Sequence, residues 1–314
     1  MATVVSITNP ITGAVEQVDK LDSTAQQIDD AVALAPQLSN QNLLDNWYFG
    51  NPVNQRGQTE YTAGGYTIDR WKLEANGTVK SASVVSSGIA LSNGDDTTYL
   101  NFAQIVEKIP AGTYVVSFLV DDFSNVNQVF CSATNTSSFT FDSNVVSLKF
   151  TLDADSDAVK IGIQKKLSGN VLTIKAAKLE LGSQQTLAHQ DADGNWVLNE
   201  ISDYGEQLRR CQRYQLVINR ETIVAGRTSA SADTTCFAFI PTPVTMRVAP
   251  AISKTVGNYI ATVNHVNGNK SITDFTGVSL AGNGIYVTGE ITTGLGTTQP
   301  ITVTIPGFIA DANL

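Results

Sequence analysis

Neighbouring carboxylates are the side chains here that could do chemistry on their own, because two carboxyl groups flanking a glycosidic bond can hydrolyse it. The candidates are the doublets Asp95-Asp96 and Asp121-Asp122 and the run Asp153, Asp155 and Asp157. Adjacent residues of a strand point to opposite faces, so neither doublet can flank one bond from within a strand. We therefore expect all three groups to serve turns and solvated surface rather than catalysis.

Other catalytic patterns are missing from the sequence. It has no Gly-x-Ser-x-Gly elbow, no Gly-x-x-x-x-Gly-Lys-Ser/Thr loop, no His-Glu-x-x-His and no Cys-x-x-Cys. The run from Asp153 to Asp157 has the spacing of a calcium loop but lacks its glycine and distal glutamate. Two histidines and three widely separated cysteines give no metal site and no disulfide framework. The sequence thus predicts a protein that is not an enzyme, with no catalytic residue, metal or cofactor.

Aromatic side chains offer a different chemistry, since a weakly charged β module binds glycans by stacking rings on sugars while amides and carboxylates supply directed hydrogen bonds. The first cluster contains Trp47, Tyr48, Phe49, Tyr61, Tyr66 and Trp71. Trp47 and Phe49 alternate like buried strand residues and Trp71 follows a strand start, so we assign these three to the core. Tyr61 and Tyr66 flank two glycines predicted to form an exposed hairpin tip, and are the candidate glycan contacts of this region.

A second aromatic set lies near the C-terminus, where Tyr259, His265, Phe275 and Tyr286 are surrounded by turns rich in glycine and asparagine. Such loops vary without disturbing a sheet, which suits a recognition surface. Tyr259 and Tyr286 are therefore further candidate glycan contacts. A lone histidine such as His265 is more often a hydrogen-bonded turn residue.

Composition limits the partners. The 314 residues carry 29 Asp and Glu against 20 Lys and Arg, a net charge of −9, which disfavours nucleic acid and anionic membrane as partners. Charged residues make up 16%, below the ~25% of ordinary domains, and small polar residues replace them as in all-β surface proteins. The chain has neither a basic signal-peptide start nor a membrane-length apolar window. We expect synthesis in a reducing cytosol that keeps the cysteines reduced.

Residues 1–41 hold a short strand-like start followed by one helical signal. Ser23 and Gln26 have capping-box spacing, and Pro36 ends the pattern. The apolar residues follow the seam of a short coiled coil and are Val18, Leu21, Ala25, Ile28, Val32 and Ala35. A helix of this length is marginal alone in water, so its apolar stripe needs a partner. Sister copies or the chain's own β domain could supply it.

Residues 42–182 alternate apolar and polar side chains between turn signals, which predicts an antiparallel β-sandwich. In residues 112–120, Tyr114, Val116 and Phe118 share the face expected to be buried. Similar runs follow at the spacing of a sandwich, at residues 145–152, 159–164 and 171–181.

Residues 183–203 are polar and without sustained periodicity, so we predict a linker at a domain boundary. Residues 204–314 begin with a briefly helical stretch at 204–214 and return to short strands punctuated by prolines. The predicted fold class is all-β, with a short N-terminal helix, an antiparallel β-sandwich and a smaller C-terminal β domain.

Six stretches of the chain, taken in order, carry a family resemblance. They are NLLDNWYF at 42–49, NPVNQRG at 51–57, YTIDRW at 66–71, KLELG at 178–182, YGEQLRRCQRY at 204–214 and PVTMRVAP at 243–250. In this order they resemble a module of tail fibre and related virion proteins of bacteriophages and prophages. The resemblance covers residues 42–310 and implies a jelly-roll sandwich like a carbohydrate-binding module, followed by a small β tip, in a homotrimer on the virion. No binding residue carries over, because the matching motifs are framework strands.

We therefore expect a structural virion fibre protein of the tail fibre or receptor-binding type, made in the host bacterial cytoplasm. Residues 1–41 would attach it to other virion proteins, three copies would associate, and the distal β domain would contact host cell-surface glycan. A head fibre or capsid decoration protein without a glycan partner stays open as an alternative. A polysaccharide depolymerase is a third, which the lack of a β-helix repeat disfavours.

Overall fold

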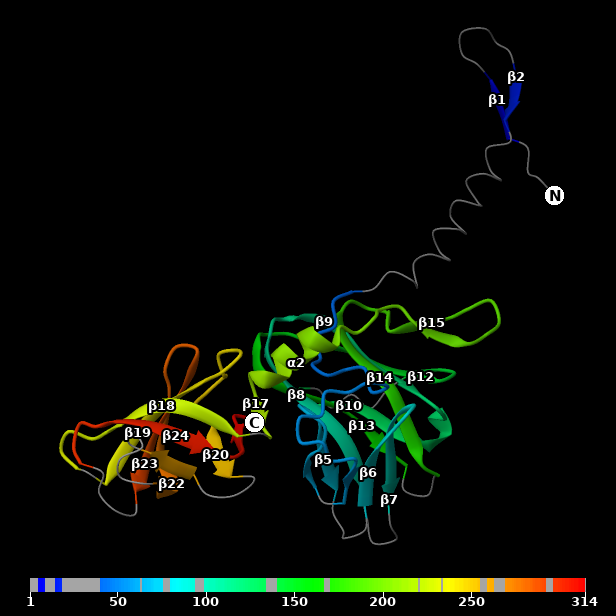
Figure 1. The fold of residues 1–314 in the computed structure, drawn as a ribbon. Coiled ribbons are helices and arrows are strands. Elements are labelled where there is room, and N and C mark those ends of the chain that lie inside the picture. The colour runs from blue at the N-terminus through cyan, green and yellow to red at the C-terminus, as the bar shows by residue number, and fades with distance from the viewer. Residues whose placement is uncertain are drawn as a thin grey trace.

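In the part of the chain that it describes, the computed structural model shows mainly antiparallel strands (Figure 1). It describes residues 5–8, 15–18 and 40–313, apart from gaps at 63, 76–79, 94–98, 134–139, 167–169, 220, 233, 255–258, 263–268 and 292–295. The all-β class predicted from the sequence is confirmed. Among the described residues, no helix has the length and apolar character needed to cross a bilayer.

The N-terminal segment contains a short hairpin of β1 (Val5–Thr8) and β2 (Val15–Val18), in which Val5 pairs with Val18. Val18 was expected to open the helical seam, and that position is wrong because it lies in a strand. The other seam positions, Leu21, Ala25, Ile28, Val32 and Ala35, lie outside the described residues. The N-terminal helix therefore stays a prediction.

Two antiparallel sheets follow in the described part of the chain. The five-stranded sheet contains, in spatial order, β10 (Val126–Cys131), β13 (Ser156–Lys165), β8 (Leu100–Ile109), β5 (Lys72–Ala75) and β4 (Gly65–Tyr66). The seven-stranded sheet contains β11 (Thr140–Asp142), β12 (Val145–Leu152), β9 (Gly112–Val120), β14 (Leu172–Leu181), β7 (Gly88–Asn93), β6 (Lys80–Val85) and β3 (Glu60–Tyr61). Consecutive strands often change sheet, so the register of each sheet is set by residues far apart in sequence.

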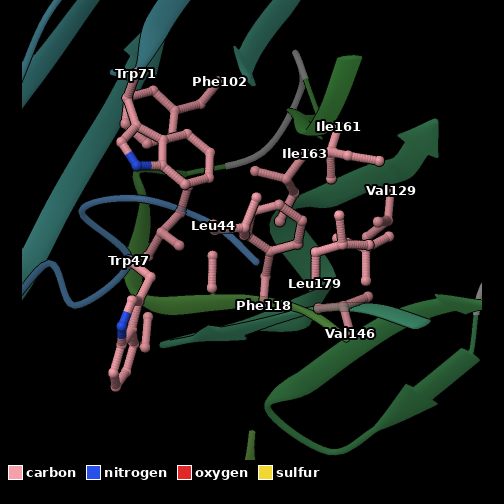
Figure 2. Close-up of a cluster of buried hydrophobic side chains, with 14 of the residues drawn as sticks. Leu44, Trp47, Trp71, Phe102, Phe118, Val129, Val146, Ile161, Ile163 and Leu179 are labelled. Carbon is pink, nitrogen blue, oxygen red and sulfur yellow. The ribbon is translucent and has the colours of Figure 1, made fainter. Parts of the chain in front are cut away.

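The inner faces of the two sheets share one apolar core (Figure 2). Trp71 stacks on Phe102 with ring centroids 4.9 Å apart, and Phe49 meets Trp71 edge-on at 5.0 Å. Trp47, Phe49 and Trp71 are buried, which confirms their assignment to the core. Aromatic contacts of this kind add about 0.5–1.5 kcal/mol to the burial of their area.

Residues 183–203 contain an ordered hairpin rather than a bare linker. Strands β15 (Ala188–Gln190) and β16 (Trp196–Leu198) pair antiparallel, and Leu187 is buried in the sandwich core. Asp191 forms the turn by accepting hydrogen bonds from the amides of Asp193 and Asn195. A polar turn between short strands has too few residues to show periodicity, which explains the linker prediction.

The C-terminal domain begins with α2 (Tyr204–Gln212), whose first turn is capped by Asp203 accepting from the Glu206 amide at 3.0 Å. In the described part a closed barrel contains β18 (Thr222–Thr228), β19 (Thr235–Pro241), β23 (Gly284–Ile291), β22 (Asn269–Leu280), β21 (Tyr259–Thr262) and β24 (Pro300–Ile305). A small sheet beside it contains β17 (Gln215–Ile218), β25 (Phe308–Asp311) and β20 (Ala251–Lys254). Barrel and small sheet share a second core, and α2 and β17 form the side of this domain that faces the sandwich (Figure 1).

A buried arginine joins the two domains. The side chain of Arg70 is 2% exposed, and its Nε donates to Asp45 Oδ2 at 3.0 Å. Its guanidinium carbon lies 3.4 Å from the ring centroid of Tyr214, and Nη2 donates to the carbonyl oxygen of Ile105 at 2.6 Å. Stacking and ion pairing together compensate the charge of a guanidinium removed from water.

Two more arginines extend this network from the C-terminal domain. Arg210 Nε lies 2.7 Å from Asp45 Oδ1, and Arg247 Nε lies 2.7 Å from Glu107 Oε1. The Tyr214 hydroxyl donates to Glu107 Oε2 at 3.0 Å. Asp45 and Glu107 belong to the sandwich, so each of these carboxylates binds groups from the other domain.

Gln55 makes a second bridge beside Asp69. Its backbone amide donates to Asp69 Oδ1 at 3.0 Å, and its Nε2 donates to the carbonyl oxygen of Gln215 at 2.8 Å. Its Oε1 accepts from the Val217 amide at 3.3 Å. Burial raises the pKa of Asp69 to about 6, despite the hydrogen bonds from Gln55 that oppose it.

Removing Arg70 should destabilise the whole chain. We expect Arg70→Ala to lower the free energy of unfolding by about 3 kcal/mol, because it strips a buried carboxylate of one counter-charge. The exposed Arg209, on α2 and 71% exposed, is the matched control, and Arg209→Ala should change that free energy by less than ~0.5 kcal/mol. Urea unfolding followed by tryptophan fluorescence measures both. Equal effects of the two substitutions would contradict the role given to Arg70.

Asp69 gives stability a pH dependence of defined sign. Its folded pKa of about 6 exceeds the ordinary 3.8, so its contribution to stability is fully present below about pH 4 and is lost as the pH rises through 6. The asparagine side chain of the Asp69→Asn variant does not titrate. Its free energy of unfolding relative to wild type should therefore rise by roughly 2 to 3 kcal/mol between pH 4 and pH 7. Urea unfolding at both pH values tests this, and a difference that stays constant with pH would refute it.

Candidate functional site

One row of side chains crosses the outer face of the five-stranded sheet. Strand pairing places Tyr66, Lys72, Ala103, Gly162 and Phe130 side by side, one from each strand. Their neighbours in sequence point into the core, so these five point outward. The row therefore has an aromatic ring at each end and two small residues near its middle.

A parallel row of polar side chains lies two residues further along the strands. It contains Glu74, Asn101, Gln164 and Gln128. Gln164 Nε2 donates to Asn101 Oδ1 at 2.8 Å, and Asn127 donates to Gln164 Oε1. Because the amides bind one another, their remaining donors and acceptors are held in fixed directions.

An ion pair spans the space above the small residues. Lys160 Nζ lies 3.0 Å from Glu74 Oε2 and 6.0 Å from the ring centroid of Phe130. Beside this ion pair is a narrow crevice with no room for a water molecule, lined by Tyr66, Arg70, Lys72, Glu74, Ala103, Ile105 and Lys160. The outer face of this sheet, defined by the two rows and Lys160, is called the sandwich face below. It combines two separated rings with charged and amide groups between them, which is the chemistry that fits a chain of sugars.

Phe130 keeps its place because residue 162 is glycine. A Cβ at this position would lie 2.5 Å from Phe130 Cζ and 2.8 Å from the carbonyl oxygen of Phe102. The phenyl ring therefore lies over the backbone of β13 in the space where a side chain would stand.

Of the predicted glycan contacts in the sandwich, Tyr66 lies on this face and Tyr61 does not. Tyr61 is in β3 of the other sheet and 7% exposed. Its hydroxyl donates to the carbonyl oxygen of Gln58 at 2.8 Å, and burial raises the pKa of Tyr61 to about 12. The predicted hairpin is wrong, because Tyr61 pairs into the seven-stranded sheet and Tyr66 into the five-stranded sheet, although Gly64 between them is exposed as expected.

The other predicted contacts, Tyr259 and Tyr286, lie on barrel strands rather than in loops. Tyr286 is in β23 and points outward, stacked beside Phe237. Tyr259 begins β21, and its side chain lies outside the described part, as does His265. The sequence signal for Phe130 was weaker than for the tyrosines, since it depends on pairing with a distant glycine.

The carboxylates that were considered as catalytic candidates, where the structure describes them, bind backbone amides in turns or a surface lysine. Asp121 Oδ1 accepts from the Thr173 amide at 2.9 Å, and Asp122 caps the short helix η2 (Phe123–Asn125). Asp155 accepts from the Ala111 amide at 2.8 Å, and Asp157 pairs with an exposed lysine. Hydrogen bonding to Ser124 lowers the pKa of Asp122.

The other acidic candidates add no cluster. Asp153 follows β12 and is exposed, and Asp95 and Asp96 lie outside the described residues. Among the residues that are described, no three His, Cys, Asp or Glu side chains come together as metal ligands.

Comparisons with known proteins add little. No family model matches the chain, and no curated protein matches it. Among solved structures, the chain aligns with a cycloisomaltooligosaccharide glucanotransferase from Paenibacillus sp., complexed with cycloisomaltoheptaose, at 9% identity and a TM-score of 0.20. The alignment covers 81% of this chain and 48% of that one, so the chain spans about half its length. At this TM-score the likeness carries no argument about fold or function.

The packing around Gly162 predicts a steric cost. Gly162→Ala should destabilise the fold by about 1–3 kcal/mol, since the new methyl group meets backbone and a ring that must move. Gly205→Ala is the control, because it makes the same change on exposed α2, where alanine favours a helix. Thermal unfolding of both variants decides the point. A neutral Gly162→Ala would show that Phe130 is not held as described.

Proposed function

We propose that the chain is a structural fibre protein of a bacteriophage virion, of the tail fibre or receptor-binding type. Three copies associate, residues 1–41 attach the fibre to other virion proteins, and the folded domains contact glycan on the host surface. The sandwich is a jelly roll like a carbohydrate-binding module. The six sequence stretches that resemble phage fibre proteins support this assignment.

The observation that carries glycan binding is the sandwich face itself. Tyr66 and Phe130 stand at its two edges, and Glu74, Lys160 and Gln164 present polar groups between them. A sugar chain lying across the strands would stack on the rings and exchange hydrogen bonds with the polar groups. Because the face is open and rigid, binding at one copy would be weak, and several copies would gain by avidity.

The described carboxylates favour binding over hydrolysis. Asp121, Asp122, Asp155 and Asp157 are occupied in turns and an ion pair. None of them lies on the sandwich face. A head fibre or decoration protein without a glycan partner remains the alternative and is an outcome of the test below.

Binding of the purified protein to immobilised host surface polysaccharide tests the proposal. We expect Tyr66→Ala and Phe130→Ala each to weaken binding by about tenfold, the size of one stacking contact. Phe123→Ala is the control, since that ring is 41% exposed but lies on η2, away from the face.

Two outcomes would sink the proposal. If the wild-type protein did not bind the polysaccharide, the alternative of a head fibre or decoration protein without a glycan partner would be favoured. A mass near 33.5 kDa, that of one chain, instead of three times that value would refute the trimer.

A further inference from the structure

The outer surface of the barrel carries a second aromatic site, apart from the sandwich face. A hollow of about 260 Å³ lies over β18, β19 and β23. Its lining residues are Ala225, Gly226, Arg227, Phe237, Ala238, Phe239 and Tyr286. We call it the barrel hollow.

Aromatic rings form the walls of the barrel hollow. Phe237 and Tyr286 are nearly parallel, at 18°, with ring centroids 5.7 Å apart. Phe239 pairs with Tyr286 across the strands and is 41% exposed. A Cβ at residue 284 would lie 2.3 Å from Phe239 Cζ, so the ring leans over Gly284. The floor consists of small residues, which leaves room for one ring-sized group.

Arg227 supplies a positive charge at the edge of the hollow. It pairs with Phe237 across the strands, and its guanidinium carbon lies 5.4 Å from the centroid of that ring. Among the described residues, no carboxylate lies within ion-pair distance of it, whereas Arg56, Arg210 and Arg247 each have one. In a protein of net charge −9, an exposed guanidinium beside stacked rings is a local site for an anion.

We propose that the barrel hollow binds a sugar residue that carries a carboxylate, such as a uronic or a nonulosonic acid. The sugar ring stacks on Phe237 and Tyr286, and its carboxylate pairs with Arg227. A neutral sugar would gain only the stacking contact and a free carboxylate only the ion pair, so a sugar that carries a carboxylate uses both features of the hollow. The inference rests on the proposed function only for the class of ligand, since the two sites lie on different domains.

An array of bacterial capsular oligosaccharides, each printed in its acidic form and after reduction of the carboxyl groups, tests the proposal. We expect the wild-type protein to bind acidic members and to lose about tenfold or more in affinity for the reduced forms. Arg227→Gln should abolish this preference for the acidic form, and Phe237→Ala should weaken binding of both forms. Arg209→Gln, which removes an exposed arginine on α2, should change neither.

The outcomes separate this site from the sandwich face. Phe130→Ala should leave the acidic preference intact. If Tyr66→Ala and Phe130→Ala bound host polysaccharide as well as the wild type while the acidic preference was retained, only glycan binding by the sandwich face would be refuted. Equal binding of acidic and reduced forms by the wild type, or no acidic member bound, would overturn the proposal. It would also be overturned if Arg227→Gln lowered the mass of the assembly, because the hollow would then be an interface between copies.

Discussion

The architecture depends on one buried guanidinium. Arg70 stacks on Tyr214 while pairing with Asp45, so the sandwich cannot separate from the C-terminal domain without exposing a ring and two charges. The network also explains why distant stretches of the sequence appear together. Asp45, Gln55, Arg70, Tyr214 and Arg247 come from five of the six stretches that resemble fibre proteins. These residues form the two sides of one interface between the domains, called the interdomain joint below. They serve the framework rather than a binding site.

The interdomain joint fixes the spacing between the two candidate glycan sites. Because Asp45 and Glu107 each pair with arginines at the interface, moving one domain would leave charges buried and unpaired, at a cost of several kcal/mol. The sandwich face and the barrel hollow are therefore held at a fixed spacing on one body. If both sites bind glycan as proposed, two weak sites in a fixed arrangement would bind a repeating polymer better than either alone, and association of three copies would increase the effect further.

The sequence predicted what depends on short-range periodicity. Strand β9 spans Gly112–Val120 and β12 spans Val145–Leu152, as the alternation of apolar residues indicated. Prediction from the sequence failed where the position of a side chain depends on strands that are distant in the chain. Two glycines between Tyr61 and Tyr66 look like a hairpin tip, yet the segment passes from one sheet to the other and buries Tyr61. The sandwich face could not be predicted, since its rows bring together five strands whose register follows from the fold.

Hydrogen exchange at the joint tests its role most directly. The amides of Asn46 and Val217 donate to the side chains of Gln207 and Gln55 across the domain boundary. If the domains form one body, both amides should exchange with the same free energy of opening as the core amides of β14, because they open only when the whole chain unfolds. Rapid exchange at Asn46 and Val217 while β14 stays protected would show that the domains part freely, and would contradict the account.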